Sequence, residues 1–290
     1  MNQEESRVRR HSYQEISELA SELEDIYKDH SVDIPNNSYL AGNIRAAKEL
    51  SDWWDQHKSV ELIHVPEPSQ EVMWRALSCD RLASAVRWVK EKPEVKGKLH
   101  MLLKGSINIT EDGWSNAKDF EFEVNSAARL EAAGLNPKFE EPDLVFQFES
   151  QSYCIACKHP YTPNAFRNLL SKGARQIQKS TYKGIIALSL DCLRPPEMIL
   201  RGGENYIIES IVSSLRSFHE DNRESIDKNL EKRKKVVGLI LSLTIPCIIE
   251  YEKPLATTAS QIIIFSIRGK ESPYHDMLDG LATLLGGVHL

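Results

Sequence analysis

The sequence has no uninterrupted apolar stretch long enough to form a membrane helix. Its longest apolar run, 236–251, is broken by Ser242, Thr244 and Pro246 and falls short of the roughly 20 residues that a membrane helix needs. Residues 1–15 contain no apolar signal region. We therefore expect buried strands at 236–251 and no contact with a membrane.

Cysteine is also scarce. The five cysteines are an odd number and lie far apart: Cys79, Cys154, Cys157, Cys192 and Cys247. This distribution argues against a disulfide framework and indicates reduced thiols in a cytoplasmic protein. Cys154 and Cys157 form a C-x-x-C pair, but alternate residues of a strand point to opposite faces, so we expect two buried thiols rather than a zinc site.

Acidic residues are missing from one long segment. The chain has a net charge of −6, yet 151–190 contains no Asp or Glu and has six basic residues, which leaves −12 for the rest. An acidic total argues against non-specific binding to nucleic acid, whereas a local basic segment can attract phosphates. The segment 151–190 is therefore the expected binding surface.

The 290 residues, 41% of them hydrophobic and 27% charged, are enough for two globular domains. We expect a mainly helical N-terminal region, 1–115, because apolar residues recur at helical spacing in three segments. Those segments are 12–27, 37–57 and 69–92, with Asn37 and Ser69 as N-caps. Their tryptophans are expected in the helical core. This region is the expected contact for a protein partner or for a second copy of the chain.

The pattern changes at about 116 and predicts an α/β domain over 116–290. A helix at 117–134 ends at Gly134 and precedes a hairpin, a second helix and a buried strand, with one more weak strand near 137–140. The expected hairpin strands are 142–149 and 153–159, the helix is 164–181 and the strand is 184–191. Beyond them we expect a helix at 202–222, strands at 236–250 and 260–268, and a helix at 274–285.

Three ionisable residues are expected to meet at one edge of this sheet. Glu123 falls on the apolar side of its helix, where a carboxylate needs a partner. Asp143 begins one hairpin strand and Lys158 ends the other. Carboxylate oxygens can hold a hard cation, and an ammonium can act on a water or a phosphate, so the pattern favours a magnesium-type site.

These residues resemble the PD-(D/E)xK nuclease superfamily, which has the restriction-endonuclease-like fold. The resemblance covers about 117–191: Glu123 on a helix, "PD" at 142–143, "ACK" at 156–158, "ARQIQ" at 174–178 and the strand that follows. It implies a Mg²⁺-dependent deoxyribonuclease, with Mn²⁺ able to substitute, acting in prokaryotic restriction or anti-phage defence.

The resemblance also implies roles for individual residues. Asp143, Lys158, Glu123 and Gln176 would be catalytic, and Asp143, Glu123 and the main-chain carbonyl of Cys157 would hold the metal. Basic residues of 164–181 would contact DNA phosphates. They are Arg167, Lys172, Arg175 and Lys179.

The sequence departs from the family at Ala156, where the family has Glu or Asp. Two interpretations stay open. In one, Glu123 compensates for the lost acid, together with Glu149 from the facing strand. In the other, the chain is a degenerate member that binds nucleic acid or a protein without cutting.

Overall fold

The chain forms a mixed α/β structure around one curled sheet. The computed structural model describes residues 11–57, 68–108, 111, 114–195, 198–250, 255–267 and 269–289. The helices are α1 (Tyr13–Asp29), α2 (Tyr39–His57), α3 (Gln70–Val89), α4 (Val95–Leu102), α5 (Asn116–Ala132), α6 (Pro163–Lys179), α7 (Glu204–Leu230) and α8 (His275–Leu284). The strands are β1 (Leu144–Phe148), β2 (Gln151–Lys158), β3 (Lys183–Ser189), β4 (Leu200–Gly202), β5 (Val236–Ile249), β6 (Leu255–Ser266) and β7 (Val288–His289).

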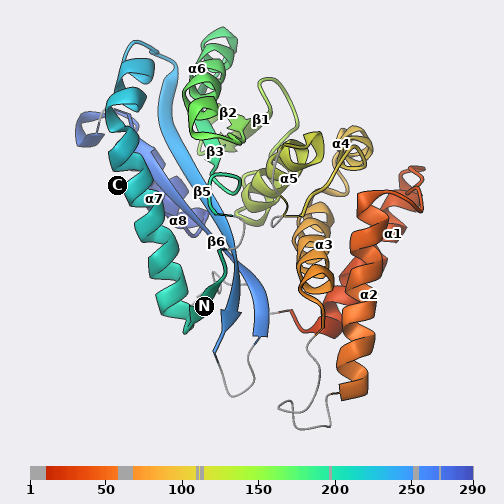
Figure 1. The fold of residues 1–290 in the computed structure, drawn as a ribbon. Helices are drawn as coiled ribbons and strands as arrows, with labels where there is room; N and C mark the ends of the chain where they lie inside the picture. The colour runs from red at the N-terminus through yellow and green to blue at the C-terminus, as the bar shows by residue number, and fades with distance from the viewer. Residues whose placement is uncertain are drawn as a thin grey trace.

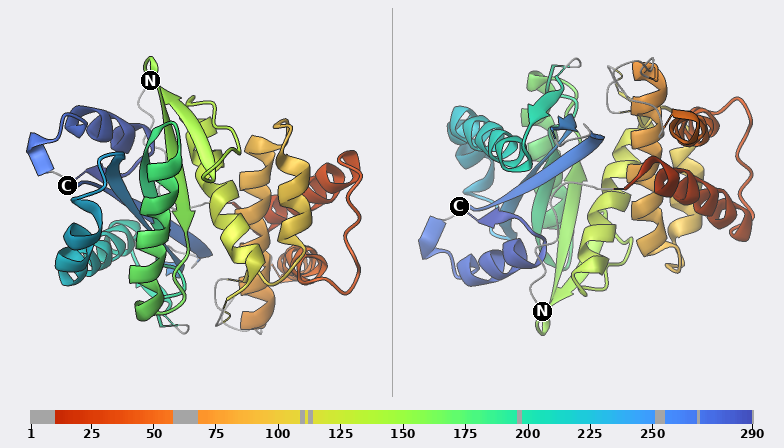
Figure 2. Two further views of the ribbon diagram at one scale, coloured as in Figure 1. Left: turned by 90° about the horizontal axis from the view of Figure 1, so that it is seen from above. Right: turned by 90° about the horizontal axis from the view of Figure 1, so that it is seen from below.

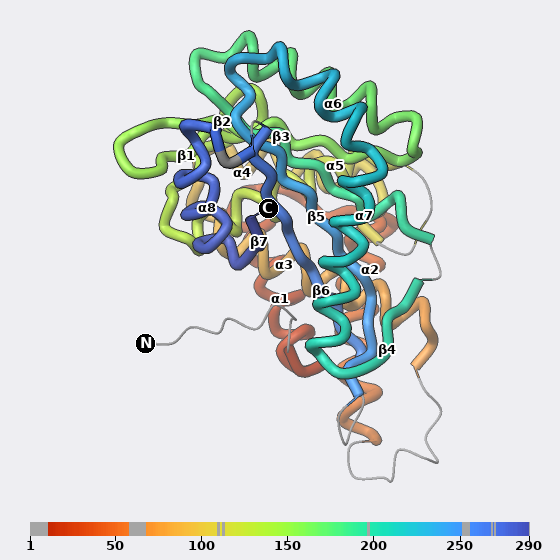
Figure 3. Tube along the Cα trace, turned by 90° about the vertical axis from the view of Figure 1, so that its left-hand side faces the viewer, coloured from red at the N-terminus to blue at the C-terminus, as the bar shows by residue number. Residues whose placement is uncertain are grey.

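The sheet has a parallel centre with antiparallel neighbours. Its order is β1-β2-β3-β5-β6-β7, with β4 paired to the far end of β5. Strands β2, β3 and β5 are parallel, while β1 is antiparallel to β2 and β6 to β5. The long β5–β6 pair runs along the molecule with α7 beside it (Figure 3). Parallel strands covered on both faces favour continuous apolar sequences, which explains the apolar run in β5.

Two apolar clusters fill the two faces of the sheet. Helices α6 and α7 cover one face, and α5 and α8 cover the other. Helices α1 to α4 lie beyond α5, on its side away from the sheet (Figures 1 and 2). Because α3 lies between α1, α2 and α5, it buries residues around its whole circumference. The apolar core of the N-terminal helices therefore continues through α5 to the sheet.

Local signals in the sequence set most helix ends. Ser69 and Ser115 accept hydrogen bonds from main-chain N–H groups of α3 and α5, at 3.2 Å from Val72 and 3.3 Å from Lys118. Gly134 has φ +75°, the left-handed conformation that ends α5. The predicted cap at Asn37 is wrong: Ser38 Oγ accepts the Ala41 N–H at 3.1 Å.

Other differences from the sequence prediction have local causes. Helix α4 and the short strands β4 and β7 were not predicted, because segments this short carry little periodicity. The weak strand near 137–140 is a single bridge between Lys138 and Val145. The four helical tryptophans do not share one core: Trp74 is buried, but Trp88 is 54% exposed. The division at residue 115 stays a prediction.

No helix in the described part of the chain has the length and apolar content needed to cross a membrane.

Candidate acid–lysine site

Asp143 and Lys158 meet at one end of the β1–β2 hairpin. Antiparallel pairing of Leu144 with Ile155 brings the start of β1 beside the end of β2. Asp143 Oδ2 accepts hydrogen bonds from Lys158 Nζ at 2.8 Å and from the Cys157 N–H at 2.7 Å. Lys158 Nζ also donates to the Cys157 carbonyl at 2.5 Å. The predicted pairing of these two residues is therefore present, with both side chains largely buried.

Glu123 reaches the same region from α5. Its carboxylate is hydrogen-bonded to Lys98 of α4, and both side chains are largely buried. Burial raises the pKa of Glu123 to about 7. The charge of Lys98 lowers this pKa, and the charge of the nearby Asp143 raises it further. Glu123 therefore changes its charge near neutral pH.

Asp143 belongs to the same electrostatic group. Burial raises its pKa, and the charge and hydrogen bond of Lys158 oppose that increase, with a smaller effect from Lys98. We call Glu123, Asp143, Lys98 and Lys158 the acid–lysine group. It contains two carboxylates and two ammonium groups, so their charges balance when all four are ionised.

Lys98 is the member of the group that sequence reasoning missed. Its ammonium lies 4.9 Å from the centre of the Phe120 ring and 5.2 Å from that of Phe139, as well as against Glu123. Residues 95–102 give no strong helical pattern, and nothing in their spacing points toward Glu123. Only the fold brings this lysine to the site.

Cys157 contributes main-chain atoms rather than its thiol. The thiol faces α5, and burial together with the charges of Asp143 and Glu123 raises its pKa well above the ordinary range. It is therefore protonated and a poor nucleophile. Cys154 lies on the opposite face of the sheet, under α6, as the strand alternation predicted.

Ala156 lies on the α6 side of the sheet. It is fully buried in the cluster beneath α6, where its Cβ lies 3.6 Å from the position that a Cβ on Gly173 would occupy. Glu149 lies at the β1–β2 turn, at the other end of the hairpin from Lys158. The interpretation that Glu149 replaces the missing acid is therefore wrong.

Gln176 and the basic residues lie on α6, which covers the sheet face opposite α5. Gln176 is partly buried, and its Oε1 has no hydrogen-bond partner within the described residues. No hydrogen bond among those residues joins it to Asp143 or Lys158. The four basic side chains expected to contact DNA are all exposed: Arg167, Lys172, Arg175 and Lys179.

The oxygen atoms of this group have the chemistry that Mg²⁺ prefers. Glu123 and Asp143 each supply a carboxylate, and the Cys157 carbonyl shares the Lys158 ammonium with Asp143. One or two carboxylates with several waters are a common Mg²⁺ environment. Across the described residues, no group of three or more His, Cys, Asp or Glu side chains is arranged to hold a metal. An ion at this position would therefore depend on two carboxylates.

A second buried ionic group lies on the other side of α5. Arg81 of α3 donates from Nε and Nη2 to the Glu121 carboxylate at 2.7 and 2.6 Å, and from Nη1 to Asp191 at 3.0 Å. We call these three residues the arginine group. Helical periodicity did not reveal it, because charged residues on a helix are normally solvated and their burial depends on how α3 packs against α5.

Comparisons with protein-family models, with curated proteins and with solved structures found no match to this chain. The resemblance to PD-(D/E)xK nucleases therefore stays a prediction.

Proposed function

We propose that this chain is a metal-dependent nuclease that hydrolyses phosphodiester bonds in DNA. One observation carries the proposal: Asp143, Glu123 and Lys158 come from a strand start, a helix and a strand end, and they lie within one buried ionic group. The order helix, hairpin, helix, strand from α5 to β3 agrees with the restriction-endonuclease-like core that the sequence resembles.

In this proposal Asp143, Glu123 and the Cys157 carbonyl would hold Mg²⁺ or Mn²⁺. The ion would neutralise charge on the phosphate and lower the pKa of a bound water. Lys158 is held by Asp143 and the Cys157 carbonyl, so its ammonium is oriented toward the same place. It would position the attacking water or stabilise charge that develops on the phosphate. Gln176 would act on the same substrate from α6, as the resemblance implies.

The exposed side of α6 is the proposed DNA contact. Arg167, Lys172, Arg175 and Lys179 project from one helix in a segment that lacks acidic residues. Such a row can contact phosphates without reading bases. The biological setting, prokaryotic restriction or anti-phage defence, rests on family analogy alone.

The test is DNA cleavage with matched variants. Supercoiled and linear DNA are incubated with the protein in Mg²⁺, Mn²⁺ or EDTA. Asp143→Asn and Lys158→Met should each reduce metal-dependent cutting by at least about 10²-fold, whereas the exposed controls Asp25→Asn and Lys96→Met should not. Circular dichroism checks that the variants fold. Absence of metal-dependent cutting by the wild type, or cutting that persists in both site variants, contradicts the proposal.

A second candidate function is a module that binds nucleic acid without cutting it. The position of Ala156 beneath α6 favours it, because the acid-bearing position of the family carries no carboxylate here. This candidate predicts DNA binding in EDTA that weakens when Arg175 and Lys179 are replaced by Ala, with no cleavage in either metal. The same experiments therefore separate the two functions.

A further inference from the structure

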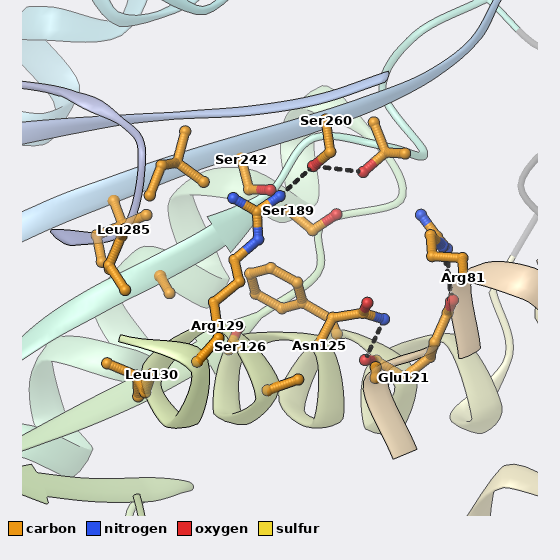
Figure 4. A pocket seen from close by; sticks show the side chains of 18 of the residues that line it. Arg81, Glu121, Asn125, Ser126, Arg129, Leu130, Ser189, Ser242, Ser260 and Leu285 are labelled. Atoms are coloured by element: carbon orange, nitrogen blue, oxygen red, sulfur yellow. Dashed lines mark hydrogen bonds and ion pairs between the residues drawn. The ribbon is translucent and has the colours of Figure 1, made fainter. Parts of the chain in front are cut away.

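A cavity of about 530 Å³ lies between α5 and the sheet. Residues of α3, α5, β3, β5 and β6 line it, together with the segment that follows α8 (Figure 4). Glu121 and Arg129 of α5 are among these residues, but Glu123 is not. The cavity is therefore separate from the acid–lysine group.

The sheet side of this cavity is lined with hydroxyl groups where apolar side chains would be expected. Ser189 of β3 is paired with Ser242 of β5, and Thr244 of β5 is paired with Ser260 of β6. Two residues away on the same face, β5 and β6 carry the apolar side chains Ile240 and Ile262 instead. Buried hydroxyl groups cost free energy unless they are hydrogen-bonded. Their concentration across three strands marks this part of the face as polar.

Arg129 extends from α5 toward these hydroxyl groups (Figure 4). Its Nη2 donates to Ser260 Oγ at 2.6 Å, and Thr244 Oγ1 donates to the same oxygen at 3.2 Å. A guanidinium has five N–H groups, enough to hold Ser260 and an anion at the same time. The cavity lies between α5 and the sheet, so donors reach it from both the helix and the strands.

His159 is a second, independent polar feature of the cavity lining. It lines the cavity and is only 6% exposed, and neither ring nitrogen has a hydrogen-bond partner within the described residues. Asp119 Oδ1 is 3.9 Å from Nδ1, too far for a hydrogen bond. A buried polar group without a partner costs about 1–3 kcal/mol. A polar molecule in the cavity could supply that partner.

The charges of the lining favour an anion. Three cationic side chains line the cavity against two carboxylates, and the carboxylates are those of the arginine group. The cationic side chains are Arg81, Lys118 and Arg129. Arg81 is bound to Glu121 and Asp191, and Lys118 donates to the Glu111 carbonyl at 2.6 Å. Arg129 is the cation that donates to a hydroxyl group of the sheet.

We propose that this cavity binds a small phosphate ester of the size of a nucleoside monophosphate, with its phosphate between Arg129 and the hydroxyl groups of Ser242, Thr244 and Ser260. A tetrahedral phosphate suits donors that surround it in three dimensions, whereas a planar carboxylate suits one guanidinium fork. The volume is within the range of small-molecule sites. Trp88 lines the cavity and is 54% exposed, so its ring is available at the opening to stack on a base. This binding does not depend on the proposed nuclease activity.

The test is isothermal titration calorimetry in EDTA with AMP, adenosine and inorganic phosphate. AMP should bind, and adenosine should bind at least tenfold more weakly. Equal affinity for AMP and inorganic phosphate would support the phosphate site and identify free phosphate as the ligand. No binding of either phosphate compound would overturn the proposal.

Variants assign any binding to this cavity. Arg129→Gln and the smaller change Ser260→Ala should each weaken AMP binding at least tenfold, while Arg223→Gln, at a largely exposed arginine of α7, should not. AMP binding that survives both cavity changes would overturn the proposal. Asp143→Asn should retain AMP binding even if it abolishes DNA cleavage, so failure of the nuclease proposal and failure of this one give different results.

Discussion

The two buried ionic groups beside α5 differ in the cations that balance their carboxylates. Glu121 and Glu123 are two residues apart, and about 200° of helical rotation separates their side chains. Glu121 faces Arg81 and Asp191, while Glu123 faces Lys98 and lies near Asp143. One helix therefore carries a guanidinium-bound carboxylate on one side and a lysine-bound carboxylate on the other.

The arginine group is suited to holding the fold together. Burial opposes the charge of Arg81, but the carboxylates of Glu121 and Asp191 outweigh this effect and raise the pKa of the guanidinium. Burial also raises the pKa of Glu121, against the charge and hydrogen bonds of Arg81. The three residues join α3, α5 and the turn after β3, and Asp191 also accepts the Thr244 N–H at 2.8 Å. In the acid–lysine group, the pKa of Glu123 is about 7. A group that changes charge near neutral pH is suited to chemistry.

The largest effect is expected from Arg81→Met. It leaves Glu121 and Asp191 buried without their cation, so the free energy of unfolding should fall by about 3–5 kcal/mol. Urea unfolding followed by circular dichroism measures the change. The control Arg87→Met removes a largely exposed arginine paired with Glu22 and should cost less than about 1 kcal/mol. Similar effects of the two substitutions would show that the arginine group does not stabilise the fold.

The second prediction concerns Ala156→Glu, which restores the acid of the family pattern. Because Ala156 is packed beneath α6 against Gly173, the new carboxylate would enter an apolar interface. We expect a loss of about 2–4 kcal/mol in unfolding free energy. Gln178→Glu on the exposed side of α6 is the control. A stable Ala156→Glu variant with higher Mn²⁺ affinity by calorimetry would show that the side chain can reach Asp143 after all.

The third prediction is a pH dependence that Glu123→Gln removes. The carboxyl holds its proton more tightly in the folded chain than in the unfolded one, since burial raises its pKa from 4.5 to about 7. Folded protein therefore binds more protons between these values, and stability falls as pH rises through this window. The wild type should lose about 1–3 kcal/mol relative to Glu123→Gln between pH 4.5 and pH 7.5.

Unfolding curves at several pH values measure this difference. Glu131→Gln is a control on the same helix, at a partly exposed glutamate paired with Lys92. If the wild type and Glu123→Gln respond to pH in parallel, the pKa of Glu123 is close to its ordinary value and the contrast with the arginine group fails.

The sequence predicts the core elements of this fold because their signals are local. Apolar periodicity, Ser69 as a cap, Gly134 as a stop and the alternation in 153–159 all indicate structure within a few residues. A hairpin is also a local feature, and it places the start of its first strand beside the end of its second. The sequence therefore predicts that Asp143 lies near Lys158. The sequence does not predict the roles of Lys98 and Arg81, because their burial depends on how separate helices pack. Ala156, at the acid position of the family pattern, packs beneath α6, and that packing also depends on how a separate helix meets the sheet.

The smallest effect on stability is expected from Lys98→Met, which tests the link between Lys98 and Glu123. Lys98 lowers the pKa of Glu123, so its removal should raise that pKa above the wild-type value of about 7. Protonation of Glu123 then avoids a buried unpaired charge, which should limit the loss of stability at pH 6 to about 1 kcal/mol. NMR titration of the Glu123 side-chain carboxyl carbon measures the shift, with the exposed Lys96→Met as the control. An unchanged or lower pKa in Lys98→Met would mean that Lys98 does not control the charge of Glu123. A higher one would show that the acid–lysine group, unlike the arginine group, can lose a cation and adjust by taking up a proton.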